Sequence, residues 1–183
     1  LTGYTCGDLF FSLATLVGGA ERALARVLKE TVRRDLVVIL GLPVLQGDRL
    51  FNAAAVLQSG RLLGVVPKTY LPGYKEYYEE RWFSSSRESR ATSVRLAGQE
   101  APFGTDLLFE ARDLPGFVLH LEVCEDLWVP LPPSTLAALA GATVLANLSA
   151  SDVTVGKADY RRLLGASHSA RCIAGCLYSA AGP

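Results

Sequence analysis

Cys124 is the side chain best placed for chemistry, because it stands where a regular segment of the chain breaks off. The segment Val118–Val123 alternates apolar and polar residues, a period of two that predicts a strand with one face in a core. An acidic pair, an aromatic residue and Pro130 follow, so Cys124 lies at the strand's C-terminal end. In α/β sheets this end opens into the ligand crevice, where rigid backbone can aim a nucleophile. The alternative is an unreactive core cysteine, since cysteine packs as a small hydrophobe.

A cysteine nucleophile needs a base or a positive charge nearby, because the thiolate is the reactive form. The chain offers two histidines. His120 shares a strand face with Cys124, but four residues along a strand put the two about 13 Å apart. His168 is expected within a helix, where a surface or capping position explains it equally well. The spacing therefore does not favour a Cys–His dyad.

Lys68 is the second candidate for a positive charge beside the thiol. It follows Pro67 at the end of a predicted hairpin strand, in an apolar neighbourhood. A lysine held there is desolvated and fixed, which suits it to stabilise a thiolate and the oxyanion of a tetrahedral intermediate. The alternative is a surface lysine whose aliphatic stem packs on apolar residues while its ammonium group reaches water.

Length and composition describe an ordinary globular domain. The 183 residues suffice for one domain with a real core, and half of them are hydrophobic. Lysine plus arginine and aspartate plus glutamate number 18 each, and this balance does not point to nucleic acid or an anionic membrane surface. No apolar run approaches the roughly 20 residues that span a bilayer. Neither nucleic acid nor a membrane is therefore an expected partner.

The four cysteines bear on the compartment as well as on chemistry. In a chain without a signal peptide they favour free thiols in a reducing compartment, and a cytoplasmic location is expected. Cys172 and Cys176 are four residues apart at a predicted helix-to-strand junction. A metal site would need more ligands than they supply, so both, like Cys6, are expected to be buried and unreactive.

The first half of the chain predicts helices followed by an antiparallel hairpin. Apolar residues at helical spacing indicate two helical segments separated by Gly18-Gly19, the first capped by Asp8. The following apolar run predicts a strand buried on both faces, ended by Gly41 and Pro43. Gly60 supplies the positive φ of a tight turn between two further strands. The expected helices are 9–17 and 21–31, and the expected strands are 36–42, 51–58 and 62–66.

The second half alternates strands and helices after a long irregular region. Residues 69–83 have no clean period and predict a structured loop, with one helical turn at 75–81, of the kind that lines sites. The polar stretch 84–99 predicts a mobile surface excursion. The expected strands are 106–110, 118–123, 143–148 and 174–179, and the expected helices are 131–140, with Ser134 as a cap, and 160–170, with Leu163 and Leu164 packing and Arg161 and Arg162 exposed.

No linker divides these elements, so residues 1–183 are expected to form a single domain. The chain begins at Leu1 rather than Met and ends directly after a strand-like segment. We therefore expect an excerpt of a longer protein, truncated at both ends.

Four colinear stretches carry a more specific signal than any one motif. They are 64–83 (GVVPKTYLPGYKEYYEERWF), 123–128 (VCEDLW), 147–151 (NLSAS) with 155–157 (VGK), and 1–4 (LTGY). Together they resemble the nitrilase superfamily of carbon-nitrogen hydrolases, and more narrowly the glutaminase domains of glutamine-dependent NAD+ synthetases. The resemblance runs along essentially the whole chain. It implies an α/β fold, the nitrilase-like four-layer α-β-β-α sandwich, truncated here at both ends.

The resemblance implies a Glu-Lys-Cys triad that hydrolyses the side-chain amide of glutamine. Cys124 would attack the amide and release ammonia, leaving a glutamyl thioester for water to hydrolyse. Lys68 would stabilise the oxyanion, and Glu79 matches a second family glutamate that positions Lys68 and the substrate amide. The base glutamate is expected a few residues before Leu1. The excerpt alone is therefore expected to have little or no activity.

Other positions match the family's substrate pocket one at a time. Tyr4, Tyr74 and Trp128 match pocket aromatics, although aromatic residues of this kind are otherwise common in cores. Ser151 matches a contact to the backbone groups of glutamine. Lys157 matches a basic position facing the α-carboxylate, where some relatives have arginine. A lysine there gives a point-charge contact in place of a bidentate fork.

The resemblance also implies a partner. Ammonia would pass to a synthetase domain of the same longer chain, which amidates deamido-NAD+ to NAD+ with ATP and Mg²⁺, and a homo-oligomer is expected. No phosphate-binding loop occurs in this chain, so no cofactor is expected to bind it. Two alternatives stay open: a stand-alone amidase or carbamoyl hydrolase of the same superfamily, and a non-catalytic assembly domain.

Overall fold

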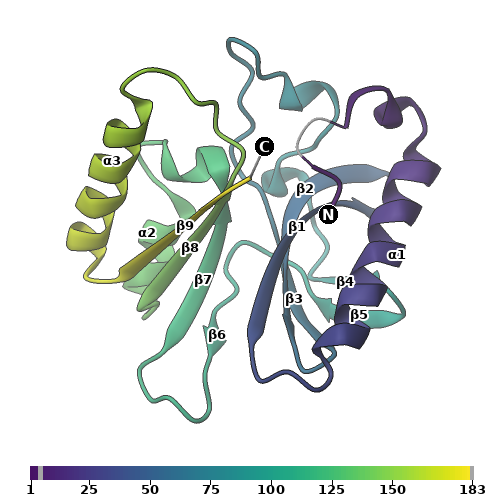
Figure 1. Cartoon of the computed structure of the whole chain (residues 1–183), viewed down its shortest axis with the longest axis horizontal. Coiled ribbons are helices and arrows are strands. Elements are labelled where there is room, and N and C mark those ends of the chain that lie inside the picture. The colour runs from purple at the N-terminus through teal and green to yellow at the C-terminus, as the bar shows by residue number, and fades with distance from the viewer. Residues whose placement is uncertain (4–5, 182–183) are drawn as a thin grey trace. The chain divides into compact units, whose positions relative to one another are not determined.

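The computed structural model describes residues 1–3 and 6–181, and Figure 1 shows its helices and strands. The chain forms two compact units, Leu1–Thr105 and Asp106–Pro183, called the first and second unit below. Each unit combines helices with β-sheet, so the mixed α/β character expected from the sequence is present in both. None of the described helices is both long and apolar enough to cross a membrane.

One continuous helix, α1 (Leu13–Thr31), follows the short 3-10 helix η1 (Gly7–Phe11) in the first unit. The predicted break at Gly18-Gly19 is wrong, because the apolar stripe continues past it. Burial of that stripe outweighs the about 1 kcal/mol that each glycine costs a helix interior. Asp8 lies in the first turn of η1 and does not cap α1, whose N-cap is Ser12. The buried positions of α1 are Leu16, Ala20, Leu24, Leu28 and Thr31.

The main sheet of the first unit is an antiparallel meander in the order β1-β2-β3. Its strands are β1 (Val37–Gln46), β2 (Arg49–Gln58) and β3 (Arg61–Pro67), so the predicted hairpin is confirmed. The prediction for the first strand is wrong in two respects. It continues through Pro43, and its first residue, Val37, is exposed. Proline is tolerated because β1 is an edge strand, where a missing N–H donor need not break the ladder.

A second hairpin belongs to the core of the first unit. It consists of β4 (Ser93–Leu96) and β5 (Gln99–Pro102). The prediction of a mobile excursion over 84–99 is wrong, because Val94 and Leu96 are buried and pack in the same cluster as Leu24 of α1 and Phe51 of β2. The alternation of Ser93, Val94, Arg95 and Leu96 is the period of a half-buried strand. Its four residues are too short a signal to stand out from the polar residues around them.

The loop between β3 and β4 contains two short 3-10 helices, η2 (Glu79–Arg81) and η3 (Ser86–Glu88). The prediction of a structured loop with one helical turn near 75–81 is confirmed by η2. At η3, the Ser85 hydroxyl accepts a hydrogen bond from Arg87 N, and the Glu88 carboxylate accepts one from Ser85 N. This reciprocal cap satisfies amide donors that a helix end leaves unpaired.

The second unit is a four-stranded sheet in the order β6-β7-β8-β9. Its strands are β6 (Phe109–Glu110), β7 (Val118–Val123), β8 (Val144–Ser149) and β9 (Gly175–Ala180). β7, β8 and β9 are parallel, and β6 pairs antiparallel with β7. The helices α2 (Pro133–Leu139) and α3 (Lys157–Cys172) connect the parallel strands, as crossovers between such strands require. The element types predicted for this half are confirmed, although β6 is much shorter than expected.

β7 is buried on both faces, so the prediction of one exposed polar face is wrong. His120 and Glu122 are as buried as the neighbouring Leu119 and Leu121. Burial on both faces is typical of a strand within a parallel sheet, whose two faces are both covered. The polar residues of β7 are tolerated because each has a partner. His120 Nδ1 lies 3.1 Å from the Leu107 carbonyl oxygen, and Glu122 accepts a hydrogen bond from Ser134 N at 3.2 Å.

Two tight turns of the first unit place a glycine in the left-handed region. Gly47 joins β1 to β2 with φ +62°, and Gly60 joins β2 to β3 with φ +77°. Their surroundings differ. A methyl group at Gly60 would lie 2.6 Å from Cγ2 of Val32, whereas no described atom lies within 4 Å of one at Gly47. A comparison of alanine substitutions at Gly47 and Gly60 therefore separates the cost of backbone strain from the cost of steric overlap.

We expect Gly60→Ala to destabilise the protein more than Gly47→Ala. Left-handed φ alone costs an alanine about 1–2 kcal/mol, and the overlap with Val32 adds about 1 kcal/mol or more at Gly60. The free energies of unfolding of both variants, measured by urea denaturation of the full-length protein, check this. Equal losses would mean that the end of α1 does not press on the turn.

Candidate active site

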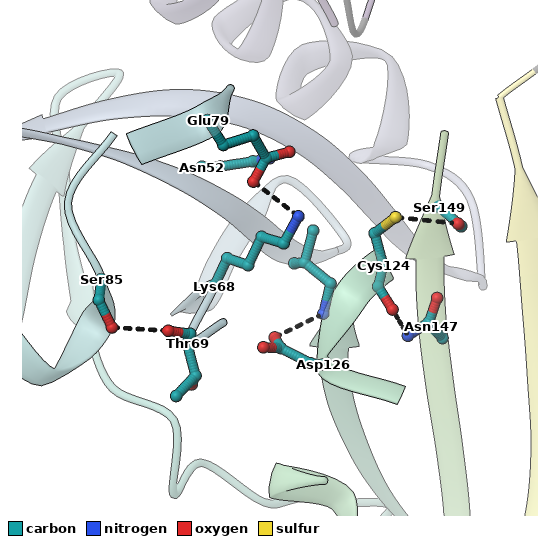
Figure 2. A network of polar contacts seen from close by, with 10 residues as sticks. Asn52, Lys68, Thr69, Glu79, Ser85, Cys124, Asp126, Asn147 and Ser149 are labelled. Carbon is teal, nitrogen blue, oxygen red and sulfur yellow. Dashed lines mark hydrogen bonds and ion pairs between the residues drawn. The ribbon is translucent and has the colours of Figure 1, made fainter. Parts of the chain in front are cut away.

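Cys124 directly follows β7 and adopts a left-handed backbone, with φ +50°. Residues other than glycine rarely adopt this conformation, and strain of this kind is found at functional turns. Asp126 in the following 3-10 helix η4 (Cys124–Leu127) holds the turn, because Val123 N donates to its carboxylate at 3.1 Å (Figure 2). The predicted position at the C-terminal end of a strand is confirmed. The sharp turn resembles in principle the strained elbow that presents a nucleophile.

Strand β8 supplies polar contacts to Cys124, and β9 extends them through Ser149. From β8, the Ser149 hydroxyl donates to Cys124 Sγ at 3.2 Å, and Asn147 Nδ2 donates to the Cys124 carbonyl oxygen at 3.3 Å (Figure 2). From β9, the Tyr178 hydroxyl donates to Ser149 Oγ at 2.5 Å. The sequence interpretation missed Ser149 and Tyr178 as site residues. Their places toward the C-terminal ends of β8 and β9, which run parallel to β7, were the available signal.

Lys68 follows β3 in the first unit and is fully buried, so a surface lysine is the wrong reading. Its backbone N donates to the Asn52 carbonyl oxygen on β2 at 2.8 Å. Its ammonium group donates to Glu79 Oε2 at 2.7 Å, and Asn52 Nδ2 lies 3.5 Å from the other carboxylate oxygen (Figure 2). The expected pairing of Glu79 with Lys68 is therefore confirmed by the geometry.

Burial gives this ion pair its rigidity. Glu79 is 4% exposed and Lys68 0%, so water does not compete with either side chain for the ion pair. Removing one member of such a pair leaves an uncompensated charge in the interior, which is far more costly than losing an exposed pair. The lysine is therefore held in one position as long as the carboxylate is present.

The remaining predicted pocket residues lie in both units. Tyr74, in the loop of the first unit, is half exposed and packs edge-on against Tyr77 at 5.9 Å between ring centroids. In the second unit, Trp128 packs against Tyr160, and Lys157 Nζ lies 5.4 Å from the centroid of the Trp128 ring. Tyr4 falls outside the residues that the structure describes.

Two of these pocket residues already have polar partners in the second unit. Lys157 forms an ion pair with Asp152. Ser151 forms a side-chain hydrogen bond with Tyr178. Ser151 is thus connected through Tyr178 and Ser149 to the sulfur of Cys124.

A buried polar cluster anchors β7 to the helices on one face of its sheet. The Ser134 hydroxyl lies 2.8 Å from His168 Nε2, and Asn147 Nδ2 donates to the Glu122 carboxylate at 3.3 Å. The surface or capping position expected for His168 is wrong, because its side chain is buried within α3, whose caps are Gly156 and Ile173. The predicted capping role of Ser134 is also wrong, because the N-cap of α2 is Pro132. Burial lowers the pKa of His168 and raises the pKa of Glu122. Both shifts favour the neutral forms, which suits an interior position.

The other cysteines show why Cys124 stands apart. Cys6 is buried as expected, whereas Cys172 and Cys176 are only partly buried, so their expected full burial is wrong. Burial nevertheless raises the pKa of both thiols, which keeps them protonated and poorly nucleophilic. Neither occupies a strained strand end of the kind that presents Cys124.

The sequence profile described as carbon-nitrogen hydrolase matches residues 1–182. The chain belongs to the carbon-nitrogen hydrolase family. Its alignment with the glutamine-dependent NAD(+) synthetase of Mycobacterium tuberculosis strain H37Rv is 50% identical over 182 residues. That alignment covers 100% of this chain and 26% of the relative, so this carbon-nitrogen hydrolase chain spans about a quarter of the relative's length.

Solved structures extend the comparison to the fold. A glutamine-dependent NAD(+) synthetase from Cytophaga hutchinsonii has a TM-score of 0.80 and 27% identity, covering 100% of this chain and 29% of that one. A CN-hydrolase superfamily protein from Xanthomonas campestris has a TM-score of 0.60 and 13% identity, covering 87% of this chain and 54% of that one. The nitrilase-like fold class predicted from the sequence is therefore confirmed for this carbon-nitrogen hydrolase.

We expect Glu79→Ala to lower the free energy of unfolding by about 3–5 kcal/mol, because it leaves the Lys68 ammonium group buried without its carboxylate. Replacing both partners, as Lys68→Met with Glu79→Leu, should recover most of the loss. Urea denaturation of the full-length protein measures both.

The matched control is Arg162→Ala, which removes an ion pair with Asp159 whose side chains are mostly exposed. It should leave the stability within error of wild type. A Glu79→Ala variant as stable as this control would show that water reaches Lys68.

Proposed function

We propose that this chain hydrolyses the side-chain amide of glutamine, with Cys124 as the nucleophile. The observation that carries the proposal is Cys124 on a strained turn at the end of a parallel strand, in a carbon-nitrogen hydrolase whose relatives bear the name glutamine-dependent NAD(+) synthetase. The hydrogen bond from Ser149 to the sulfur supports a reactive thiol rather than a packing role. The buried pairing of Lys68 with Glu79 supports a lysine held for chemistry rather than for solubility.

The reaction follows from the groups proposed. The Cys124 thiolate attacks the amide carbon of glutamine, and the carbonyl oxygen becomes an oxyanion that the Lys68 ammonium group stabilises. The general base, which has taken the proton of the Cys124 thiol, passes it to the leaving nitrogen. The C–N bond then breaks, ammonia leaves, and a glutamyl thioester remains. The base then takes a proton from a water molecule as that water adds to the thioester carbon. The C–S bond breaks to give glutamate, and the proton returns to the sulfur to restore the free thiol.

The general base is the part of the proposal that this sequence does not supply. The family resemblance assigns it to a glutamate expected before Leu1. Glu79 already pairs with Lys68, so we assign it to positioning the lysine and the substrate amide. Activity is accordingly proposed for the full-length protein and not for these 183 residues alone.

The remaining predicted residues are assigned to holding glutamine. Ser151 would contact its backbone groups, and Lys157 would attract its α-carboxylate as a point charge. Tyr4, Tyr74 and Trp128 would form aromatic walls. In the structure Lys157 pairs with Asp152. The α-carboxylate of glutamine would therefore either displace Asp152 from Lys157 or bind Lys157 alongside it.

The released ammonia would serve a second reaction in the same longer protein. We propose a synthetase domain that uses ATP and Mg²⁺ to amidate deamido-NAD+, as the name of the relatives suggests. A homo-oligomeric assembly and a cytoplasmic location belong to the same proposal.

Cys124→Ala should abolish NAD+ synthesis from glutamine in the full-length protein while leaving synthesis from free ammonia intact, because only the first requires the thioester. Both rates are measured by NAD+ formation under saturating ATP. Cys172→Ala, which removes a thiol outside the proposed site, should change neither rate. Loss of both activities in a folded Cys124→Ala protein would contradict the assignment of a separate glutaminase step.

Lys68→Ala should slow thioester formation about 100-fold or more, since removal of one oxyanion donor typically costs that much. The first turnover of ammonia release, followed by rapid quench, measures the step. Lys29→Ala on the exposed surface of α1 is the control and should be unaffected. An unchanged rate in a Lys68→Ala protein with intact circular dichroism would remove Lys68 from the mechanism.

A further inference from the structure

We propose that Ser149 and Tyr178 position the Cys124 sulfur and stabilise it as a thiolate, through a hydrogen-bond chain that runs from the phenol to the serine hydroxyl to the sulfur. The inference rests on the proposed function, in which Cys124 is the nucleophile. It assigns a role to two residues that the sequence interpretation did not name as site residues, although Ser149 lies within the motif 147–151.

The chain is built by the parallel register of the second unit. Ser149 is the last residue of β8, and Tyr178 lies near the end of β9, the next strand along. The carboxyl ends of parallel strands lie at one edge of a sheet, so these side chains meet that of Cys124 at the end of β7. Figure 2 shows the Ser149 hydroxyl directed at the sulfur, and the two atoms are 3.2 Å apart.

The direction of the hydrogen bonds follows from counting protons. Burial raises the pKa of Tyr178, so its phenol keeps its single proton near neutral pH. That proton is donated to Ser149 Oγ, at 2.5 Å. Because the Ser149 oxygen accepts from Tyr178, its own proton is left to donate to Cys124 Sγ. The sulfur is therefore the acceptor at the end of the chain.

A donor at this position favours the charged form of sulfur over the neutral form. Hydrogen bonds to an ionised acceptor are roughly twice as strong as those between neutral groups. The thiolate attacks the amide, and the same thiolate is the leaving group when water cleaves the thioester. Ser149 therefore assists both steps while keeping its proton.

Other charged and polar groups of the second unit lie near this hydrogen-bond chain, but they do not take the place of Ser149 as the donor to the sulfur. The guanidinium carbon of Arg161 lies 5.3 Å from the Tyr178 ring. The Glu122 carboxylate on β7 is bonded to Asn147, whose amide also holds the Cys124 carbonyl oxygen. Ser151 also forms a hydrogen bond with the phenol and is itself a proposed contact to glutamine. Among the described residues of this unit, Ser149 is the one that donates a defined hydrogen bond to the sulfur.

Ser149→Thr and Ser149→Val are the matched pair that tests the proposal. Threonine keeps the hydroxyl and valine has nearly the same shape without it, and both β-branched residues suit a strand. The rate of Cys124 alkylation by iodoacetamide at fixed neutral pH reports the fraction of thiolate. We expect the alkylation rate of the valine variant to be about one tenth of that of the threonine variant, or lower still. The kcat for glutamine hydrolysis should fall in parallel, with KM within about twofold.

Tyr178→Phe removes the outer donor and should give a smaller loss, about threefold, in both measurements, because it acts through Ser149. Ser179→Ala, on the same strand but exposed, is the control and should leave both unchanged. Peptide mapping of the alkylated full-length protein assigns the label to Cys124, and labelling of Cys172 and Cys176 should stay constant across the series.

Equal alkylation rates and equal kcat values for the threonine and valine variants would overturn the proposal. If neither variant folds, Ser149→Ala and Tyr178→Phe carry the same comparison against wild type. The alkylation measurement needs no glutamine, so it tests the hydrogen-bond chain independently of the proposed glutamine hydrolysis. A slower thiol in a protein whose Cys124→Ala variant still uses glutamine would support the hydrogen-bond chain while contradicting the proposed function.

Discussion

The parallel pairing of β7, β8 and β9 is the constraint on which the candidate nucleophile depends. It brings the ends of three strands, far apart in the sequence, to one edge of a sheet. Cys124 turns out of the first strand in a left-handed conformation, and the ladder with β8, which runs as far as Val123, keeps that strained residue in place. Without the neighbouring strands, neither the orientation of the thiol nor its serine donor would be defined.

Burial of polar groups is the second theme of the structure. β7 carries a histidine and a glutamate inside a covered sheet, and the first unit buries a lysine with its glutamate. Each is stabilised by a specific partner: a backbone carbonyl for His120, amide donors for Glu122, and a carboxylate for Lys68. Buried polar residues with good partners impose one arrangement on the side chains around them, because any other arrangement leaves a charge or donor unpaired. Such rigidity is what a catalytic group requires of its support.

The first unit shows how packing overrides local preference. A pair of glycines in the middle of α1 and a proline within β1 both argue locally against regular structure. The helix nevertheless continues because its apolar stripe closes the core over the sheet, and the strand continues because it lies at an edge. The polar stretch after the long loop likewise contains a short hairpin whose two inward residues join the same core.

The sequence by itself determined the family, the order and type of most elements, and the position of Cys124 at a strand end. These rest on local patterns: alternation, helical spacing, turn glycines and four colinear motifs. Only the tertiary structure decided that β7 is covered on both faces, that His168 and Lys68 are buried, and that Ser149 and Tyr178 reach the thiol. A local pattern cannot report these, because burial and cross-strand contacts depend on which segments pack together, and that pairing is set by residues many positions away.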